Sequence, residues 1–363
     1  MNTDRHPLQS FFSPRSIVVY GATNDSDKPG GRIFTLLRRY GRPVYAIHPT
    51  LDSVDGFPVH RSASPLPEVP DLAVLAVSAR HSEEALSDAL QAGVKAAIIV
   101  ASGFSETGPA GAEAEQRLVS LAREKGARLL GPNTLGIFVP HTGLDTIFVE
   151  HGDRSLLPGG SIAVVSQSGS VGVEALGYAS SSGFGLRAFV GLGNKCDVNE
   201  IELAEWFARD EGTRVLGFYL EDFSSAREFL YDLDRISAQK PVVMLKGGRT
   251  AAGAHAVSSH TGALAGSGRV VDGTWRQFGV HHVRDDQQFC DFCKVLSLCP
   301  PMEGDRVAII SPAGGYGVMA ADSLDSLTGP VRLRVADLTP DTVGPSGCHS
   351  PLPPNTPSVP RCR

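Results

Sequence analysis

The fold is decided by the stretch Ser16-Ile17-Val18-Val19-Tyr20-Gly21-Ala22-Thr23, near the beginning of a 363-residue chain. The apolar run over residues 17–20 predicts a short strand that is buried on both faces, as strands of parallel sheets are. Residues 30–40 have the pattern of a helix. A strand, a glycine-containing turn and a helix in this order are typical of the first unit of an open α/β sheet, in which the turn faces a ligand.

The alternation of apolar strand and helix continues to about residue 150. It predicts a parallel sheet covered by helices on both faces, which is a Rossmann-like domain over residues 8–150. The further strands are expected at residues 43–47, 72–77, 96–100 and 128–130, and the further helices at residues 81–92 and 112–125.

A second alternating unit follows and predicts a flavodoxin-like domain over residues 157–299. A linker at residues 300–304 then leads to a partial third α/β domain over residues 304–343. Strands are expected at residues 162–165, 187–190, 215–220, 242–246, 306–311 and 331–335, and helices at residues 169–180, 201–209, 224–237, 268–278, 287–298 and 318–327.

Residues 344–363 contain six prolines and no periodic apolar face, so we expect a disordered tail there. The net charge of −6 argues against nucleic acid as a general partner. Six scattered cysteines indicate reduced thiols in a cytoplasmic protein. Residues 1–6 lack the apolar segment of a signal peptide, and no apolar run approaches membrane-spanning length.

The turn after the first strand contains Gly21, Ala22, Thr23 and Lys28. Backbone N–H groups and a helix N-terminus at such a turn attract an anion, and Lys28 adds a positive charge. The glycine spacing is not GxGxxG, and the second strand ends at His48 without the acidic residue that holds an NAD ribose. We therefore expect a nucleotide-phosphate ligand rather than NAD, with an ordinary strand–helix turn as the alternative.

Two further glycine-rich helix starts are candidate phosphate sites. Ser168, Gly169 and Ser170 connect a predicted strand to a helix, although Ser168 could serve simply as a helix cap. Gly314 and Gly315 lie at the corresponding turn of the third unit. If both helix starts faced one phosphate, their N–H groups and dipoles would hold a phosphohistidine from two sides.

One histidine, His260, lies within the small-residue run 258–267. Small residues let the backbone approach a ligand or let the segment move, and a neutral imidazole can form a covalent intermediate. The run therefore suits a histidine that carries a phosphoryl group, with a small-residue helix start as the alternative. Glu221 follows an apolar strand and could fix the tautomer of an imidazole, with a solvated acidic turn as the alternative.

Three other signals remain. Cys290 and Cys293 form a CxxC pair in a helical pattern without further ligands at zinc spacing, so we expect a structural pair and no metal site. The histidines at 281–282 are expected in a loop. Before the helix at 201–209, Lys195 could meet an anion and Asp197 could cap the helix.

Together these motifs resemble the ADP-forming acyl-CoA synthetases, also called ADP-forming acetate–CoA ligases, and more distantly the alpha subunit of succinyl-CoA synthetase. The resemblance covers roughly residues 8–342, and the order and spacing of its motifs make it specific. The motifs are Gly21-Ala22-Thr23, Gly131-Pro132-Asn133, Ser166-Gln167-Ser168-Gly169, Gly193-Asn194-Lys195, Ser259-His260-Thr261-Gly262-Ala263 and Ala313-Gly314-Gly315.

The resemblance implies that acyl-CoA and phosphate give an acyl phosphate and free CoA, after which a histidine takes the phosphoryl group and passes it to ADP. It implies that His260 is this nucleophile and that Glu221 orients and stabilises it. The other implied roles are one phosphate-binding helix start at Ser168, Gly169 and Ser170, a second at Gly314 and Gly315, and a CoA site lined by Gly21, Ala22, Thr23 and Lys28.

The resemblance also implies partners that the chain does not supply. No ATP-grasp domain is recognisable, so ATP, ADP and Mg would bind a separate ATP-grasp beta subunit in a hetero-oligomer, with a small carboxylic acid or acyl-CoA as substrate. The third domain stops early, and Pro312 and Tyr316 are unusual beside its glycine turn. The alternatives are a non-catalytic CoA-binding sensor or scaffold, an incomplete ligase fragment and, less favoured by the motifs, an NAD-dependent oxidoreductase.

Overall fold

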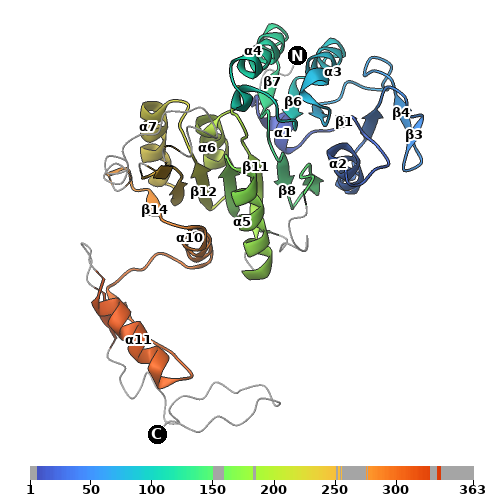
Figure 1. Ribbon diagram of the computed structural model, residues 1–363. Helices are drawn as coiled ribbons and strands as arrows, with labels where there is room; N and C mark the ends of the chain where they lie inside the picture. Colours follow the sequence, from blue (N-terminus) through green and yellow to red (C-terminus); the bar gives the residue numbers. More distant parts are fainter. Residues whose placement is uncertain are drawn as a thin grey trace, which may run out of the picture. The chain divides into compact units, whose positions relative to one another are not determined.

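A computed structural model of the chain describes residues 6–149, 159–182, 185–250, 252, 253, 255, 275, 277–327 and 333–336 (Figure 1). The chain divides into two compact units, Met1–Cys299 and Pro300–Arg363. The first unit contains two α/β sheets, and the second contains a two-stranded sheet with one helix. Among the described residues, none of the helices is long and apolar enough to cross a membrane.

The first sheet has the strand order β3-β4-β2-β1-β5-β6-β7. If β3 is set aside, the remaining six strands run parallel in the spatial order third, second, first, fourth, fifth, sixth, which is the order of Rossmann folds. The predicted Rossmann-like class is therefore confirmed. The parallel strands are β1 (Ile17–Tyr20), β2 (Val44–Ile47), β4 (Phe57–His60), β5 (Leu72–Leu75), β6 (Ala96–Ile99) and β7 (Arg128–Leu130).

Helices cover both faces of this sheet because side chains alternate along its strands. Ile17 and Val19 belong to the hydrophobic cluster that contains Phe34, whereas Val18 and Tyr20 belong to a separate cluster on the other face. The helical elements are α1 (Gln9–Phe12), α2 (Pro29–Leu37), η1 (Arg38–Tyr40), α3 (Ala79–Gln91), η2 (Ser105–Thr107) and α4 (Pro109–Glu124).

A hairpin that the sequence analysis did not predict supplies one of the parallel strands. Strand β3 (Ser53–Val54) pairs antiparallel with β4, and Asp55 and Gly56 form the two-residue loop between them. Both loop residues have left-handed backbone angles, with φ of 49° at Asp55 and 80° at Gly56. An Asp-Gly pair favours this type of tight hairpin turn, so the signal was present in the sequence.

The second sheet has the strand order β14-β13-β12-β10-β11-β8-β9. Its five parallel strands follow the flavodoxin order second, first, third, fourth, fifth when β10 is taken as the first, which confirms the predicted flavodoxin-like class. They are β10 (Ile162–Ser166), β11 (Leu186–Gly191), β12 (Val215–Leu220), β13 (Val242–Lys246) and β14 (His281–Val283).

Within the described ranges, four helices flank this sheet. The α5 and α10 helices contact each other on the face to which Ile162 and Val164 point. The α6 and α7 helices contact each other, and residues of both share a hydrophobic cluster with Ala163 and Val165 on the opposite face (Figure 1). The helices are α5 (Gly169–Ser182), α6 (Glu200–Arg209), α7 (Ala226–Ser237) and α10 (Asp286–Leu298).

The strands β8 (Ile137–Val139) and β9 (Leu144–Asp145) come from the range predicted for the first domain but join the second sheet. Strand β8 pairs antiparallel with β11, with Phe138 opposite Phe189, and β9 pairs antiparallel with β8. The two sheets therefore interlock within one compact unit. The histidines at 281–282 lie in the edge strand β14 and not in a loop, because their backbone continues the parallel sheet beside β13.

In the second unit, the strand expected at residues 306–311 was predicted too long. Only β15 (Arg306–Val307) pairs, because its partner β16 (Arg334–Val335) is equally short. Helix α11 (Gly314–Asp325) begins four residues before the predicted start and has no buried residue. Residues 344–363, where disorder was predicted, and most of the helix predicted at 268–278 lie outside the described residues.

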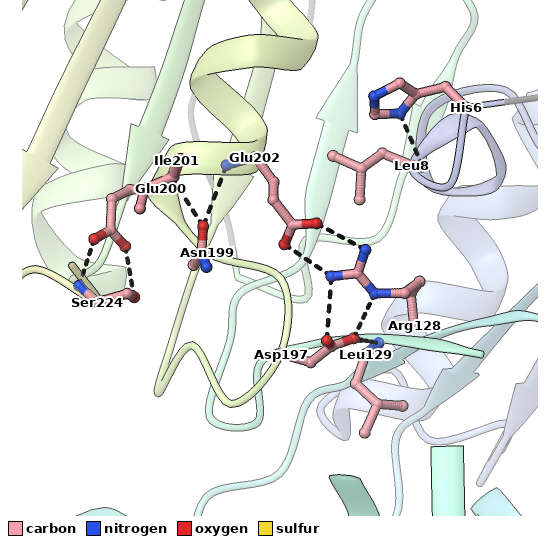
Figure 2. A network of polar contacts seen from close by, with 10 residues as sticks. All are labelled: His6, Leu8, Arg128, Leu129, Asp197, Asn199, Glu200, Ile201, Glu202 and Ser224. Atoms are coloured by element: carbon pink, nitrogen blue, oxygen red, sulfur yellow. Dashed lines mark hydrogen bonds and ion pairs between the residues drawn. The ribbon is translucent and has the colours of Figure 1, made fainter. Parts of the chain in front are cut away.

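A charged clamp ties the last strand of the first sheet to helix α6 (Figure 2). The Arg128 guanidinium donates to Glu202 at 2.8 Å through two nitrogens and to Asp197 at 2.9 and 3.1 Å. The bond to Glu202 is the main cause of a raised pKa of Arg128. The Leu129 amide also donates to Asp197 at 2.8 Å. The arginine side chain is 23% exposed, so water screens these bonds only partly.

Replacing Arg128 with methionine should therefore lower the free energy of unfolding by about 2 kcal/mol, because two carboxylates lose their cation. Urea unfolding measures this change. Arg117→Met is the matched control, since Arg117 pairs with Glu83 at 3.0 Å on an exposed surface and should contribute less than about 0.5 kcal/mol. Equal losses in the two variants would contradict the clamp.

Candidate functional site

The first turn predicted to bind an anion lies where β1 meets β5, the point at which the strand order reverses and ligands of such sheets bind. Gly21 has a φ of +81°, and a Cβ atom there would lie 2.5 Å from the Ala76 carbonyl oxygen. The start of α2 packs against this turn, because a Cβ on Gly30 would lie 1.9 Å from the Gly21 carbonyl oxygen. A Cβ on Gly31 would lie 2.1 Å from the Asp25 carbonyl oxygen. Glycine is thus required on both sides of the contact between turn and helix.

The predicted CoA-site residues all belong to this turn, with different exposures. Ala22 is fully buried, so only its backbone is available to a ligand. The Thr23 hydroxyl accepts from the Asp25 amide at 3.3 Å. Lys28 lies at the N-cap position of α2 and forms an exposed ion pair with Asp25 at 3.4 Å. The sequence analysis gave no role to Gly30 and Gly31. Two adjacent glycines at a helix start were the signal that could have indicated this close contact.

The second turn lies where β10 meets β12, the point of order reversal in the second sheet. Ser166 of β10 and Tyr219 of β12 are paired residues, so Ser168 and Glu221 each follow that pair by two positions. Gln167 connects the two chain segments. Its side-chain oxygen accepts from the amides of Glu221 at 2.8 Å and Asp222 at 3.2 Å, and its nitrogen donates to the Asp222 carboxylate at 3.1 Å.

Glu221 is buried, with 7% of its surface exposed, so the structure excludes the alternative of a solvated acidic turn. The Tyr219 hydroxyl donates to its carboxylate at 3.2 Å, and the Lys246 ammonium donates to its backbone oxygen at 2.6 Å. Burial lowers the pKa of Lys246, and burial together with the charge of Glu221 raises the pKa of Tyr219. The carboxylate is therefore buried beside the end of β10, where the Tyr219 hydroxyl donates to it and the backbone of Glu221 is held by Gln167 and Lys246.

The helix start beside Glu221 is tightly built. The Ser166 hydroxyl donates to the Ser168 carbonyl at 2.7 Å, and the hydroxyls of Ser168 and Ser170 are 3.2 Å apart. Gly172 packs so closely on the Phe189 ring that a Cβ there would lie 2.5 Å from it. Ser168 is partly exposed and Ser170 is exposed, so both hydroxyls can reach a ligand at the N-terminus of α5.

The structure does not bring every predicted site residue together. His260 lies outside the described residues. Gly314 and Gly315 are the first residues of α11 in the second compact unit, and a Cβ on either would meet nothing within 4 Å among the described residues. Among the described residues, therefore, no close contact of the kind seen at Gly21 and Gly30 requires glycine at positions 314 and 315.

The loop before α6 contains Lys195, which could have met an anion, and Asp197, which could have capped the helix. Asn199 caps the helix, because its side chain accepts from the amides of Ile201 at 3.0 Å and Glu202 at 3.2 Å (Figure 2). Asp197 instead pairs with Arg128. The side chain of Lys195 is only 5% exposed and forms ion pairs with carboxylates of this chain. The sequence spacing gave no signal for these pairings.

The CxxC cysteines lie on α10 and face the core of the second sheet. Cys290 and Cys293 are buried free thiols within the cluster that contains Phe289. Burial raises the pKa of Cys290 to about 12. Within the described ranges, no group of three potential metal ligands is present.

A Rossmann-type sheet followed by a flavodoxin-type sheet, each with a helix start at its order reversal, is the arrangement expected of the class of CoA ligases. In agreement with this class, the family model of a CoA binding domain matches residues 15–140, and that of a succinyl-CoA ligase like flavodoxin domain matches residues 159–296. The chain is 36% identical over 324 residues to the acetate–CoA ligase (ADP-forming) I subunit alpha of Pyrococcus furiosus, covering 88% of this chain and 69% of that one.

Longer relatives and a solved structure agree. The chain is 35% identical to the acetate–CoA ligase (ADP-forming) II of Archaeoglobus fulgidus, covering 93% of this chain but 49% of that protein. The dinucleotide-forming acetyl-coenzyme A synthetase 1 of Ca. Korarchaeum cryptofilum, solved with phosphate and ADP, superposes with a TM-score of 0.81 at 35% identity, over 87% of this chain and 68% of that one. The chain belongs to the family of ADP-forming acetate–CoA ligases, which are acid–thiol ligases. This confirms the resemblance derived from the motifs.

Proposed function

We propose that the chain is the alpha-type subunit of an ADP-forming acyl-CoA synthetase, which interconverts acid, CoA and ATP with acyl-CoA, ADP and phosphate. The observation that carries the proposal is the buried carboxylate of Glu221 beside the α5 helix start, at the order reversal of the second sheet. In the proposal, Glu221 orients an imidazole and the α5 helix start beside it binds phosphate, and both lie in the same compact unit as the CoA-binding domain.

The reaction has three balanced steps, each reversible. A phosphate oxygen attacks the thioester carbonyl carbon, forming the acyl phosphate as the carbon–sulfur bond breaks and CoA leaves as a thiolate. An imidazole nitrogen of His260 then attacks phosphorus, and the bond to the carboxylate oxygen breaks to release the acid. Finally, the terminal oxygen of ADP attacks the phosphohistidine, which restores the imidazole and forms ATP.

The chain's residues bind and orient the reactants in this scheme. The N–H groups and hydroxyls at Ser168, Gly169 and Ser170 hold the phosphate, and the helix start at Gly314 and Gly315 is a second proposed phosphate-binding group. Glu221 accepts from the imidazole of His260 and stabilises its cationic form. The turn formed by Gly21, Ala22, Thr23 and Lys28 holds the phosphates of CoA.

A separate ATP-grasp beta subunit is part of the proposal, and it would bind ATP or ADP together with Mg in a hetero-oligomer in the cytoplasm. Two facts support this: the Pyrococcus relative is a subunit alpha, and the chain spans about half of the Archaeoglobus relative. The substrate would be a small carboxylic acid or its CoA thioester. The domain limits 8–150, 157–299 and 304–343, followed by the tail 344–363, remain predictions.

Reconstitution tests the proposal. The full chain, mixed with an ATP-grasp beta subunit of the family, should form ATP from acetyl-CoA, ADP and phosphate, and each ATP should appear with one free CoA thiol. ATP formation without thiol release, or thiol release without phosphate, would contradict the reaction scheme.

A non-catalytic CoA-binding role, or an incomplete ligase fragment, is the second candidate. One observation favours it: α11 has no buried residue, and its side chains Tyr316, Val318 and Met319 are 68%, 61% and 65% exposed. In the part of the second compact unit that the structure describes, the α11 helix therefore packs on no hydrophobic core. This candidate predicts normal CoA binding with no phosphorylation of the chain in the reconstituted mixture.

The glycine contact at the first turn gives a binding prediction. Gly30→Ala should weaken CoA binding by at least about 10-fold, because a Cβ 1.9 Å from the Gly21 carbonyl oxygen forces the anion turn and α2 apart. Calorimetric titration with CoA measures the effect. Gly177→Ala in α5 is the control, since a Cβ there meets nothing within 4 Å and the affinity should not change. An unchanged affinity in Gly30→Ala would place CoA elsewhere.

A further inference from the structure

The loop over residues 193–198 crosses between the two sheets and holds both. Gly193 has a φ of +60°, and a Cβ there would lie 2.1 Å from the Pro132 carbonyl oxygen of the segment after β7. The Asn194 and Cys196 amides donate to Pro132 at 2.9 Å and to Gly131 at 3.0 Å. Lys195 between them has a φ of 57°, in the left-handed region that lysine rarely adopts. The backbone of this loop is thus fixed against the first sheet.

Two adjacent side chains of this loop bind to opposite sides. The side-chain nitrogen of Asn194 donates to the carboxylates of Glu106 at 2.6 Å and Glu115 at 2.9 Å, in the region that follows β6 of the first sheet. Burial acts to raise the pKa of Glu106, but the hydrogen bonds from Asn194 and from backbone amides lower it overall. Lys195 points instead to the segment that follows β12, where its ammonium bonds to the Asp222 carboxylate and, at 3.2 Å, to the Asp222 backbone oxygen.

The segment after Glu221 is held by a second carboxylate that shares the same lysine. Glu200 is fully buried and lies 3.3 Å from the Lys195 ammonium. It also accepts from the Ser224 amide at 2.6 Å and from the Ser224 hydroxyl at 3.1 Å (Figure 2). Lys195 is therefore a shared cation for two carboxylates, of which Glu200 is fully buried and Asp222 is 21% exposed. Without it, the buried Glu200 would lose its cation, which is costly for a carboxylate out of contact with water.

We infer that Lys195 is a positioning residue for Glu221, and that the loop over residues 193–198 couples the position of Glu221 to the carboxyl edge of the CoA-binding sheet. The inference rests on the proposed function, which gives Glu221 its role. Lys195 touches no reacting atom. It sets the chain direction directly after Glu221, and Asn194 transmits the position of the region around Glu106 to the same turn.

Catalysis is sensitive to such placement, because an error of about 1 Å in a catalytic group costs about 100-fold in rate. In the reconstituted enzyme, Lys195→Met should lower kcat by about 100-fold while the KM for CoA stays within about 3-fold. Lys195→Arg should restore most of the loss, because it keeps the positive charge. Asn194→Ala removes only the side-chain bonds to Glu106 and Glu115 and keeps the backbone bonds of the loop, so it should lower kcat by about 3- to 10-fold.

Lys240→Met is the matched control. The Lys240 ammonium also donates to two backbone oxygens, of Phe207 at 3.1 Å and of Asp210 at 2.6 Å. Lys240 precedes β13 and so lies at the amino ends of the strands, whereas Glu221 lies at the carboxyl ends. Loss of the Lys240 ammonium should lower the thermal midpoint and leave kcat unchanged. Equal falls in kcat for Lys240→Met and Lys195→Met would show that general destabilisation is the cause and would overturn the inference.

A second readout needs no activity. Hydrogen exchange of the Glu221 and Asp222 amides, which donate to Gln167, should become at least about 10-fold faster in Lys195→Met and stay unchanged in Lys240→Met. Unchanged exchange in a folded Lys195→Met protein would overturn the inference. A wild-type enzyme without turnover would instead refute the proposed function, and the exchange result would still decide whether Lys195 fixes this turn.

Discussion

Replacing His260 with alanine should abolish interconversion of acyl-CoA and ATP, with kcat reduced by at least about 10⁴-fold. The imidazole is the only group in the proposed scheme that carries phosphorus between the acyl phosphate and ADP. No binding energy elsewhere can replace the lost covalent intermediate, so the fall should appear in kcat and not in KM. The measurement is ATP formation from acetyl-CoA, ADP and phosphate with an ATP-grasp beta subunit present.

The affinity of His260→Ala for CoA should stay at the wild-type value, because the proposed CoA turn lies within residues 15–140, which match the CoA binding domain, whereas His260 belongs to the range 159–296, which matches the flavodoxin domain. His255→Ala is the control, since it removes an exposed imidazole from the same region of the chain without touching the proposed chemistry. Retention of more than about one hundredth of wild-type turnover in His260→Ala would mean that another group carries the phosphoryl.

Glu221→Gln should lower the rate of phosphoryl transfer by about 10²- to 10⁴-fold. Glutamine keeps the volume of the buried side chain and can still accept from the Tyr219 hydroxyl, which lies 3.2 Å from the carboxylate. The change therefore removes mainly the negative charge that orients the imidazole and stabilises its cationic form. Rapid-quench measurement of phosphohistidine formation follows this step directly.

The stability of Glu221→Gln should remain close to wild type, which separates loss of charge from loss of fold. Glu228→Gln on the exposed surface of α7 is the control and should change neither rate nor stability. A Glu221→Gln enzyme that forms phosphohistidine at the wild-type rate would remove Glu221 from the mechanism, and the Lys195 inference would then lose its catalytic meaning.

The elements that could be predicted from sequence are those with a strong local signal. The apolar run of β1 predicted the strand and Gly21 predicted the turn that follows it, and the close contact at Gly21 explains why glycine is needed there. The helix start at Ser168–Ser170 was found in the same way. Each of these signals lies within about ten residues of chain.

The elements that were missed depend on distant parts of the chain. Strands β8 and β9 follow the first sheet in sequence, but β8 pairs with β11 of the second sheet and β9 pairs with β8, and no local pattern specifies that choice. The hairpin at Asp55 and Gly56 is the exception, since its two-residue signal was present.

The polar network at the second turn could not be predicted because its members are far apart in the sequence, with whole helices and strands between them. Gln167 and Lys195 meet Asp222 from positions 55 and 27 residues away. Single buried polar residues look alike in a sequence, and only the fold shows that their donors and acceptors match. The same holds for Arg128, whose partners lie 69 and 74 residues further along the chain.

The most direct test of the account is to map the phosphorylated residue. The full chain is incubated with its ATP-grasp partner and MgATP, or with acetyl-CoA and inorganic phosphate, and is then digested and sequenced by mass spectrometry under alkaline conditions. We expect one phosphoryl group on His260 in both incubations, and it should be stable in base and lost in acid. A folded chain that stays unlabelled, or one labelled at another residue, would contradict it.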